Sequence, residues 1–280
     1  MRRENPVMAQ PKPVSSPGNP TIKAVRALAH KKRRRETGRF AAPGVRMLRE
    51  AVACGHALET LVVHPDTRAG GDGRVLLDAC AAAGGEVVEA DEHVLAKLTG
   101  RDNPPGAVGV LPQPWRRFRD LPRHGSRAFV VLDGLRDPGN VGAIVRSAEA
   151  AGAAGVVVLG ETCDPFAPES VRASTGAVFA QPLVRAGWQA FLRWRRKQGG
   201  RLVATAGGAA TDFRAARYPR PTFLLMGDEH AGVPPAHAAQ CDEAVAIPMR
   251  GRTESVNVTV AAALVLYEID RQHHGAEVAA

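Results

Sequence analysis

Residues 132–146 read LDGLRDPGNVGAIVR, and their pattern determines the fold class that is expected for the chain. It continues the apolar run Phe129–Leu132, which predicts a buried strand, and its glycines and proline predict a sharp turn. The apolar side chains from Val141 to Ala148 recur at helical spacing, so a helix is expected over Asn140–Ala151. A buried strand, a turn and a helix in this order form the repeating unit of a parallel α/β sheet.

The alternation of strands and helices continues along the rest of the chain. Further strands are expected at 156–159, 202–204, 223–226 and 244–247, and further helices at 168–174, 188–197 and 257–271. Continuous apolar strands separated by helices predict a mostly parallel sheet that is covered by helices on both faces. In such sheets the ligand site lies at the carboxyl ends of the strands.

A smaller α/β unit is expected before this sheet, over residues 40–112. Short apolar runs at 61–63, 87–88 and 107–111 predict its strands, and helical patterns separate them. The stretch that follows lacks clean periodicity and is interpreted as a linker. The domain boundaries expected from these patterns are 40–112 for the small unit, 113–127 for the linker, 128–272 for the second domain and 273–280 for a tail.

The basic residues are concentrated at the N-terminus. The net charge is +9, and residues 1–39 account for all of it, because they hold 11 Arg and Lys against Glu4 and Glu36. Residues 1–22 are rich in proline and poor in apolar side chains, so residues 1–39 are interpreted as a disordered tail and basic arm. Such a cluster is typical of proteins that bind phosphate backbones, and it has few apolar residues to insert into a lipid surface.

The composition argues against several other classes of protein. No apolar run approaches the roughly 20 residues of a membrane span, and the N-terminus lacks the apolar segment of a secretory signal, so a cytoplasmic protein is expected. The four cysteines are far apart and form no CxxC pair, so neither a metal site nor a disulfide framework is expected. Glycines at 134, 139 and 142 do not match the GxGxxG of dinucleotide-binding folds.

Two further segments carry polar residues where predicted strands end. The segment LLMGDEHAGVP, residues 224–234, places Glu229 in a turn after Gly227, where glycine permits close backbone approach. The segment IPMRGRTESVNVT, residues 247–259, alternates Ser255 and Asn257 with valines, so both polar side chains face the same way in an extended backbone. Two uncharged polar groups on one face suit the binding of a hydroxyl or an amide.

Each segment taken singly also has a purely structural interpretation. Asn140 could cap the helix that follows it, and Arg146 could pair with Glu149 at the surface. Glu229 could be an ordinary turn carboxylate, and the polar pair of the third segment could cap the last helix. The spacing within one segment does not decide between these interpretations and a catalytic role.

In their order and spacing, the three segments together resemble the SpoU/TrmH-type RNA ribose 2′-O-methyltransferases of the SPOUT superfamily. The pattern of that family has Asn and Arg six apart after a strand, then Gly-x-Glu-x-x-Gly, then Ile-Pro-Met and Ser-x-Asn-Val-Ser/Thr before the last helix. The corresponding residues here are Asn140, Arg146, Gly227, Glu229, Gly232, Ile247 to Met249 and Ser255 to Thr259. The segment RASTGAVF, residues 172–179, also resembles the family, and the match covers residues 128–272. The N-terminal unit resembles the family's ribosomal-protein-like RNA-binding domain more weakly.

The resemblance implies a sheet whose C-terminal part is threaded into a trefoil knot. It implies that the methyl donor S-adenosylmethionine (AdoMet) binds bent in this knot, largely through backbone groups around Gly227, Ile247, Met249 and Val256. No metal is needed, because the sulfonium of AdoMet already activates the methyl group. The resemblance also implies a homodimer with the site near the subunit interface. The candidate interface is the last helix, with Leu264, Val265, Tyr267 and Ile269.

The catalytic residues that the resemblance implies are Arg146, Asn140, Glu229, Ser255 and Asn257. Arg146 is expected at the reacting end, where it contacts the ribose 2′-hydroxyl and its phosphate. The family often assigns this arginine as general base, but guanidinium groups in proteins stay protonated, so stabilisation of the developing alkoxide is the role favoured here. The other four residues are expected to orient Arg146, the ribose and the donor.

The expected function is AdoMet-dependent methylation of a ribose 2′-hydroxyl in structured RNA. Ribosomal RNA is the first choice and transfer RNA the second, because a two-domain chain with a basic arm suits a structured RNA. The rival from another class is a non-catalytic RNA-binding or ribosome-assembly factor of the same fold, which would be expected to have lost a site residue. Housekeeping modification and antibiotic resistance through rRNA methylation share this chemistry, and the sequence does not separate them.

Overall fold

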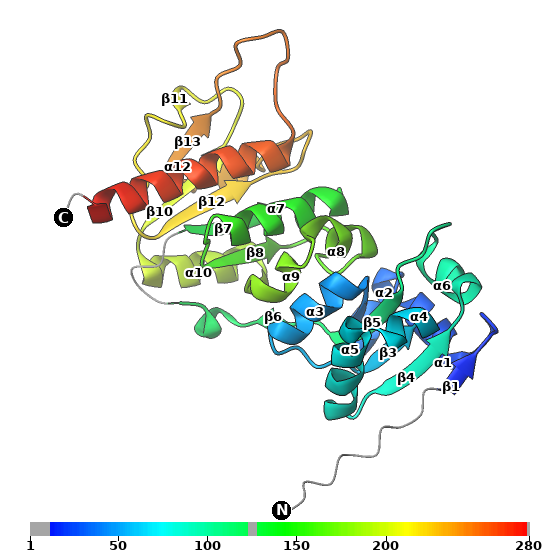
Figure 1. Ribbon diagram of the computed structural model, residues 1–280. Coiled ribbons are helices and arrows are strands. Elements are labelled where there is room, and N and C mark those ends of the chain that lie inside the picture. Colours follow the sequence, from blue (N-terminus) through cyan, green and yellow to red (C-terminus); the bar gives the residue numbers. More distant parts are fainter. Residues whose placement is uncertain (1–11, 123–127, 279–280) are drawn as a thin grey trace, which may run out of the picture. The chain divides into compact units, whose positions relative to one another are not determined.

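The structure, a computed structural model, describes residues 12–122 and 128–278 and separates into two compact units. The first unit comprises residues 1–113 with 166–168, and the second comprises 114–165 with 169–280 (Figure 1, blue to cyan and green to red). Each unit is built on its own sheet. Within the described residues, no helix combines the length and the hydropathy that a membrane span requires.

The first unit is a mixed five-stranded sheet in the order β1-β4-β3-β5-β2. Strand β4 pairs in parallel with β1 and β3, whereas β5 is antiparallel to β3 and β2. The strands are β1 (Lys12–Val14), β2 (Arg39–Pro43), β3 (Thr60–Val63), β4 (Glu86–Ala90) and β5 (Ala107–Pro112). The helices are α1 (Pro20–Ala27), α2 (Lys31–Thr37), α3 (Val45–Ala53), α4 (Pro65–Ala69), α5 (Gly71–Ala82) and α6 (Glu92–Thr99).

The N-terminal segment is structured, so the prediction of disorder is wrong for residues 12–39; residues 1–11 lie outside the described ranges. Asn19 caps α1 by accepting from the backbone N–H of Thr21 at 2.8 Å, and Pro20 occupies the first turn, where it costs no hydrogen bond. Apolar side chains three residues apart, from Ile22 to Leu28, are buried in the core. The proline content of residues 1–22 predicts disorder, whereas Pro20 begins a helix.

The basic cluster is only partly a solvated surface. Arg34 on α2 is 3% exposed and donates to the carbonyl oxygens of Leu28 and Ala29 at 2.9 and 2.8 Å. Its charge therefore ties α2 to the end of α1. The neighbouring side chains of Lys31 and Arg35 are exposed, and so is that of Lys32, whose ammonium lies 3.9 Å from the carboxylate of Glu36.

The second unit is an eight-stranded sheet in the order β11-β13-β10-β12-β7-β8-β9-β6, and all its strand pairs are parallel. Its strands are β6 (Trp115–Arg116), β7 (Ala128–Asp133), β8 (Gly155–Leu159), β9 (Leu183–Ala186), β10 (Arg201–Thr205), β11 (Thr211–Asp212), β12 (Thr222–Met226) and β13 (Glu243–Ala246). Its helices are α7 (Pro138–Ala150), α8 (Pro168–Ser174), α9 (Ala177–Ala180), α10 (Trp188–Gln198), α11 (Pro235–Ala238) and α12 (Val258–Val278), with a 3₁₀ turn at Phe118–Asp120. The parallel sheet expected from the sequence is confirmed.

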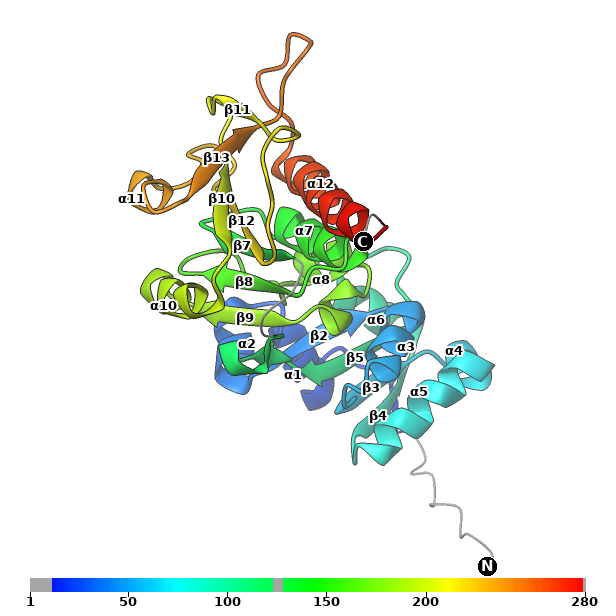
Figure 2. The same ribbon diagram turned by 90° about the vertical axis from the view of Figure 1, so that its left-hand side faces the viewer.

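Helices cover both faces of this sheet. Strand residues such as Phe129 and Phe223 form one core with Phe191 and Leu192 of α10. Their neighbours along each strand point to the other face, where α7 and α12 pack against each other and against the sheet. Figure 2 shows α10 and α12 on opposite sides of the strands.

Two expected boundaries differ from the structure. The stretch interpreted as a linker contains β6, which extends the sheet by pairing with β9, and Leu121, which is buried in the same core; residues 123–127 lie outside the described ranges. The expected tail from residue 273 is instead the end of α12, and His273 is 3% exposed. Both stretches lack clear periodicity because each is held to the second unit by few buried side chains, such as Leu121 and His273. The threading of the knot is not tested by strand order and stays a prediction.

Candidate active site

The polar segments singled out in the sequence meet at the carboxyl edge of the second sheet. Strands β7 and β12 pair in parallel, with Leu132 opposite Met226, so the turns that follow both strands emerge side by side. Strand β10 lies on the other side of β12. The segment before α12 returns to the same edge, because its Ser255 and Val256 line a cavity together with Gly227.

Glu229 is the hub of the hydrogen bonds at this edge. Its carboxylate accepts from the side-chain amide of Asn140 at 3.0 Å and from the backbone N–H groups of Arg136 and Asp137 at 3.2 and 3.3 Å. The amide of Asn257 donates to Asn140 Oδ1 at 3.3 Å. The structure thus connects three of the predicted residues by successive hydrogen bonds, from Asn257 through Asn140 to Glu229.

The alternative that these residues cap a helix is wrong for Asn140 and correct for Asn257. Asp137, not Asn140, caps α7, because Asp137 Oδ1 accepts from the backbone N–H of Asn140 at 3.0 Å. Asn257 does act as a capping residue: its Oδ1 accepts from the backbone N–H and the hydroxyl of Thr259 at 2.8 and 2.6 Å. The amide group of Asn257 remains available for Asn140, so one side chain fixes the start of α12 and joins the site.

The same hydrogen bonds lower the pKa of Glu229. Burial alone would raise that pKa, but the amide of Asn140 and the backbone N–H groups of Arg136 and Asp137 favour the ionised form, and together they outweigh burial. Ionised Glu229 therefore contributes stability above its unfolded pKa of about 4.3. That contribution is lost as the pH falls through the lower folded pKa.

Replacing Glu229 with Gln is therefore expected to destabilise the fold at pH 7 and to have little effect in acid. The amide keeps the size of the side chain but presents a donor where the carboxylate accepts backbone N–H groups. Urea unfolding at pH 7 and at pH 3 measures the difference, which should shrink toward the lower pH. Glu254→Gln is the matched control, because Glu254 is exposed and makes no hydrogen bond with any described residue. An equal effect of Glu229→Gln at both pH values would contradict the assignment.

The loop after β12 is a tight turn that only glycine permits at its first position. Asp228 and Gly232 exchange backbone hydrogen bonds of 3.0 and 2.9 Å, and the carboxylate of Asp228 accepts from the N–H groups of His230 and Ala231. A Cβ on Gly227 would lie 2.2 Å from the carbonyl carbon of Gly232. Gly227 therefore lets the two sides of the turn approach each other, and this approach presents Glu229 to Asn140.

A cavity of about 170 Å³ opens beside this loop. All four residues predicted to bind a cofactor, Gly227, Ile247, Met249 and Val256, line it, and so do Glu229 and Ser255. Part of the wall was missed in the sequence: Thr205, Ala206 and Gly207, at and after the end of β10. The sequence signal for them is the glycine pair Gly207-Gly208 after a predicted strand, because ligands bind at the carboxyl ends of parallel strands, but the sequence does not show that this strand lies beside β12.

Arg146 is the predicted residue that the structure does not bring into contact with the others. It lies on α7 six residues after Asn140, about 9 Å along the helix axis, and it is exposed. Among the described residues it has no hydrogen bond or ion pair, and this includes Glu149, so the expected alternative of a surface pair is not observed. The result is an exposed cation on the same helix as Asn140. No described group of three or more His, Cys, Asp or Glu could hold a metal ion.

Comparison with known proteins identifies the class of this fold and site. The model of the SpoU rRNA methylase family matches residues 127–267, and the chain belongs to that family. The resemblance noted in the sequence is thereby confirmed. The model of the MRM3-like substrate binding domain matches residues 19–109, which include the helices α1 and α2.

Several relatives cover nearly the whole chain. The 23S rRNA (uridine(2479)-2′-O)-methyltransferase of Streptomyces viridochromogenes is 33% identical over 88% of this chain and 87% of its own length. The crystal structure of the AdoMet-bound rRNA methyltransferase from Sinorhizobium meliloti has a TM-score of 0.86 and 40% identity, covering 95% of this chain and 99% of that one. The SpoU methyltransferase AviRb from Streptomyces viridochromogenes in complex with AdoMet has a TM-score of 0.83 and 33% identity, covering 91% and 98%.

Proposed function

We propose that this protein transfers a methyl group from AdoMet to a ribose 2′-hydroxyl of ribosomal RNA. The observation that carries the proposal is the cavity at the carboxyl edge of the second sheet, because its wall adjoins the chain of hydrogen bonds from Asn257 to Glu229. Family membership and AdoMet-bound relatives of nearly full length support it.

The residues of the cavity fit AdoMet chemically. Asp228, Glu229 and Glu254 are among its lining residues, and their carboxylates complement the positive sulfonium and ammonium groups of AdoMet. Val245 and Ile247 offer an apolar surface for a flat base, and further apolar residues complete that part of the wall. When bound, AdoMet supplies an activated methyl group, so the protein has to place the 2′-hydroxyl in line with it and accommodate the charge that develops on the oxygen.

The roles of the protein's own residues follow from their positions. Glu229 and Asn140 hold the turn after β12 against the start of α7, and Asn257 holds the start of α12 to the same point. These three are positioning residues, and Ser255 on the cavity wall is suited to orient the donor or the ribose. Exposed Arg146 is the group that can meet RNA approaching along α7, where its guanidinium binds the phosphate and stabilises the developing alkoxide.

Ribosomal RNA is preferred over transfer RNA because two relatives of nearly full length are named as 2′-O-methyltransferases of 23S rRNA. These include the 23S rRNA (guanosine(2553)-2′-O)-methyltransferase RlmP of Bacillus subtilis, which is 26% identical over 92% of this chain and 99% of its own length. A non-catalytic assembly factor is disfavoured, because every residue of the predicted site is present.

The test is to incubate the protein with labelled AdoMet and either unmodified large-subunit rRNA or bulk tRNA. Label is expected in rRNA at a single nucleotide, and a 2′-O-methyl group at that nucleotide blocks alkaline cleavage of the neighbouring phosphodiester. Label in tRNA alone would show that the substrate is tRNA and not rRNA. Absence of AdoMet binding and of label in both RNAs would refute the proposal.

We further infer that the chain forms a homodimer through α12. Val260, Leu264 and Tyr267 are 45%, 40% and 53% exposed, and Val256 just before the helix is 36% exposed. Val260, Leu264 and Tyr267 recur at helical spacing on α12 and form an apolar stripe that a second copy would bury. Two residues expected in the interface, Val265 and Ile269, are instead buried in the core, at 0% and 1% exposed, because the helix packs its opposite side onto α7 and the sheet.

Replacing both Leu264 and Tyr267 with Asp is expected to convert the dimer into a monomer that keeps its fold, because charged groups on the stripe cannot be buried without a partner. Sedimentation velocity measures the mass, and the thermal melting temperature checks the fold. Val75→Asp is the matched control, since Val75 is equally exposed, at 45%, but lies in the first unit. A double variant that stays dimeric would place the interface elsewhere.

A further inference from the structure

The second unit contains a long basic stretch that its overall charge conceals. Residues 170–211 hold seven Arg and Lys and no Asp or Glu. Residues 40–280 as a whole are formally neutral, because acidic residues outside this stretch offset it. In the second unit, basic and acidic residues are therefore separated along the sequence. Where the basic side chains lie in the folded unit determines whether they are available to a partner.

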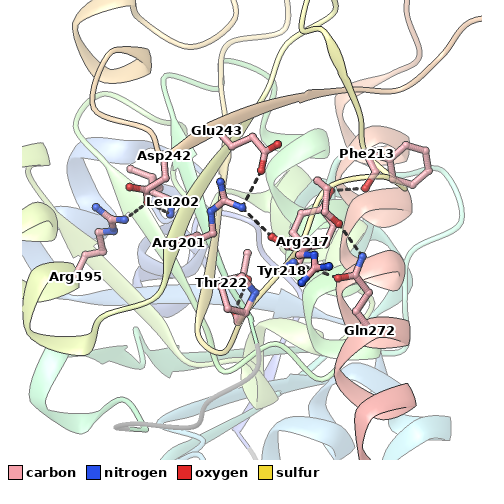
Figure 3. Close-up of polar contacts among 12 residues, drawn as sticks. Arg195, Arg201, Leu202, Phe213, Arg217, Tyr218, Thr222, Asp242, Glu243 and Gln272 are labelled. Atoms are coloured by element: carbon pink, nitrogen blue, oxygen red, sulfur yellow. Dashed lines mark hydrogen bonds and ion pairs between the residues drawn. The ribbon is translucent and has the colours of Figure 1, made fainter.

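Four of the seven basic side chains are used inside the unit. Arg195 and Arg201 turn toward the segment that leads into β13, where Arg195 pairs with Asp242 and Arg201 with Glu243 at 3.0 Å (Figure 3). These ion pairs tie the end of α10 and the start of β10 to β13. The remaining two internal pairs join Arg172 to Glu169 and Arg185 to Asp164.

The other three basic side chains, Arg193, Arg196 and Lys197, all lie on α10. All three are exposed, and within the described part of the chain none makes a hydrogen bond or an ion pair. Their spacing of three and four residues places them on one face of the helix. Helix α10 contains no acidic residue that could neutralise this face. We call these three residues the α10 basic face.

Aromatic packing fixes the direction of the α10 basic face. On the opposite side of the helix, Phe191 is fully buried, and Trp194 stacks on Phe118 with ring centroids 4.6 Å apart. The ring of Trp194 also meets Phe129 and Phe223 edge-on, at 5.2 and 5.5 Å. The helix cannot rotate without breaking these contacts, so the three cations are presented to the solvent on a rigid support, which lowers the entropic cost of binding.

The proposed dimer would leave this surface open. Helix α10 covers the face of the sheet opposite α7 and α12 (Figure 2). A second copy bound to α12 therefore does not cover the α10 basic face. At the same time, Trp188 at the start of α10 stacks on His237 of α11, close to the carboxyl edge of the sheet that carries the cavity. A long polyanion could thus contact α10 and also reach the site.

We propose that the α10 basic face binds phosphates of the RNA substrate at a distance from the nucleotide that is methylated. The inference rests on the proposed function, which makes RNA the substrate. Three unpaired cations without acidic neighbours on their helix complement a phosphate backbone, and such contacts position an RNA without reading its sequence. A lipid surface fits less well, because the apolar side chains of α10 are packed in the core and none is free to insert. RNA capture by this protein is then shared between the first unit and the catalytic unit.

The test replaces Arg193, Arg196 and Lys197 together with Gln and measures binding to RNA over a range of salt concentrations without AdoMet. The probes are an unmodified large-subunit rRNA transcript and an unrelated RNA hairpin. Each phosphate contact contributes roughly 0.7–0.9 to the slope of log affinity against log salt, so the slope is expected to fall by roughly 2 for both RNAs. In the methylation assay, KM for RNA should rise while kcat at saturating RNA stays unchanged.

Two controls make the result decisive. The charge-conserving variant R193K/R196K/K197R should retain the wild-type slope, and unchanged AdoMet binding by the Gln variant shows that the fold is intact. A Gln variant with the wild-type affinity and slope overturns the inference, whatever the activity of the enzyme. A reduced slope in a protein that methylates no RNA would support the α10 basic face and refute the proposed function, so the two failures are distinguishable.

Discussion

Replacing Arg146 with Ala is expected to lower the rate of methyl transfer by roughly 10²–10³-fold while AdoMet binding stays unchanged. The size of the effect is that of removing one preorganised donor from a developing oxyanion, about 2.7–4 kcal/mol. The fold should not suffer, because Arg146 is exposed and has no hydrogen bond or ion pair with a described residue that the substitution could break. Surface substitutions of this kind change stability by about 0.5 kcal/mol or less.

Single-turnover kinetics with saturating RNA separate the chemical role of Arg146 from a role in RNA binding. A loss confined to the rate constant places the guanidinium at the reacting oxygen, whereas a loss confined to RNA affinity makes it a phosphate contact only. Arg146→Lys should recover part of the rate, since it keeps the charge but loses the fixed fork of donors. Arg217→Ala is the matched control, because Arg217 is another exposed arginine of the second unit whose guanidinium has no partner among described residues. A normal rate for Arg146→Ala would remove this residue from the mechanism.

The grouping of polar side chains at the candidate site could be predicted from the sequence because these side chains follow the ends of strands. Asn140 and Glu229 are 89 residues apart, and no local pattern joins them. Each nevertheless follows a buried strand, and the parallel pairing of β7 with β12 brings the two turns together. Short polar motifs at strand ends thus carried three-dimensional information that the spacing within any one motif did not.

Two features were not predicted from the sequence, because proline content and net charge summed over long stretches conceal local structure. The first is the pair of helices in residues 20–37, where proline content suggested disorder although Asn19 and Pro20 form a helix start and Ile22 faces the core. The second is the α10 basic face, because the charge of residues 40–280 sums to zero. Which cations remain unpaired depends on contacts such as those of Arg195 and Arg201 with β13, and these exist only in the folded chain.

Some residues of the cavity wall could be predicted from the sequence, and others could not. Gly227 and Ile247 could be assigned because they belong to motifs, whereas Thr205 and Gly207 carry no motif and enter the wall only because β10 lies next to β12. The order of strands in a sheet is set by tertiary packing and crossover connections. A list of strands without their order in the sheet is therefore not enough to predict all residues of a ligand site.

Replacing Gly227 with Ala is expected to lower the affinity for AdoMet at least about tenfold and to destabilise the protein by about 1–3 kcal/mol. The added Cβ would lie 2.2 Å from the carbonyl carbon of Gly232, 2.3 Å from the nitrogen of Val233 and 2.4 Å from the oxygen of Gly232. All three are backbone atoms, so no rotation of a side chain relieves the clash and the turn itself has to open. Opening the turn moves Glu229 away from Asn140 and changes the wall of the cavity.

Isothermal titration with AdoMet and thermal unfolding measure the two effects of Gly227→Ala. Gly208→Ala is the matched control: it adds the same methyl group close to the cavity, at a glycine whose Cβ would meet no atom within 4 Å. Its affinity for AdoMet should equal that of the wild type. If instead Gly227→Ala binds AdoMet normally and melts at the wild-type temperature, the turn after β12 tolerates opening. The close approach of Gly227 to Gly232 would then not be what shapes the site.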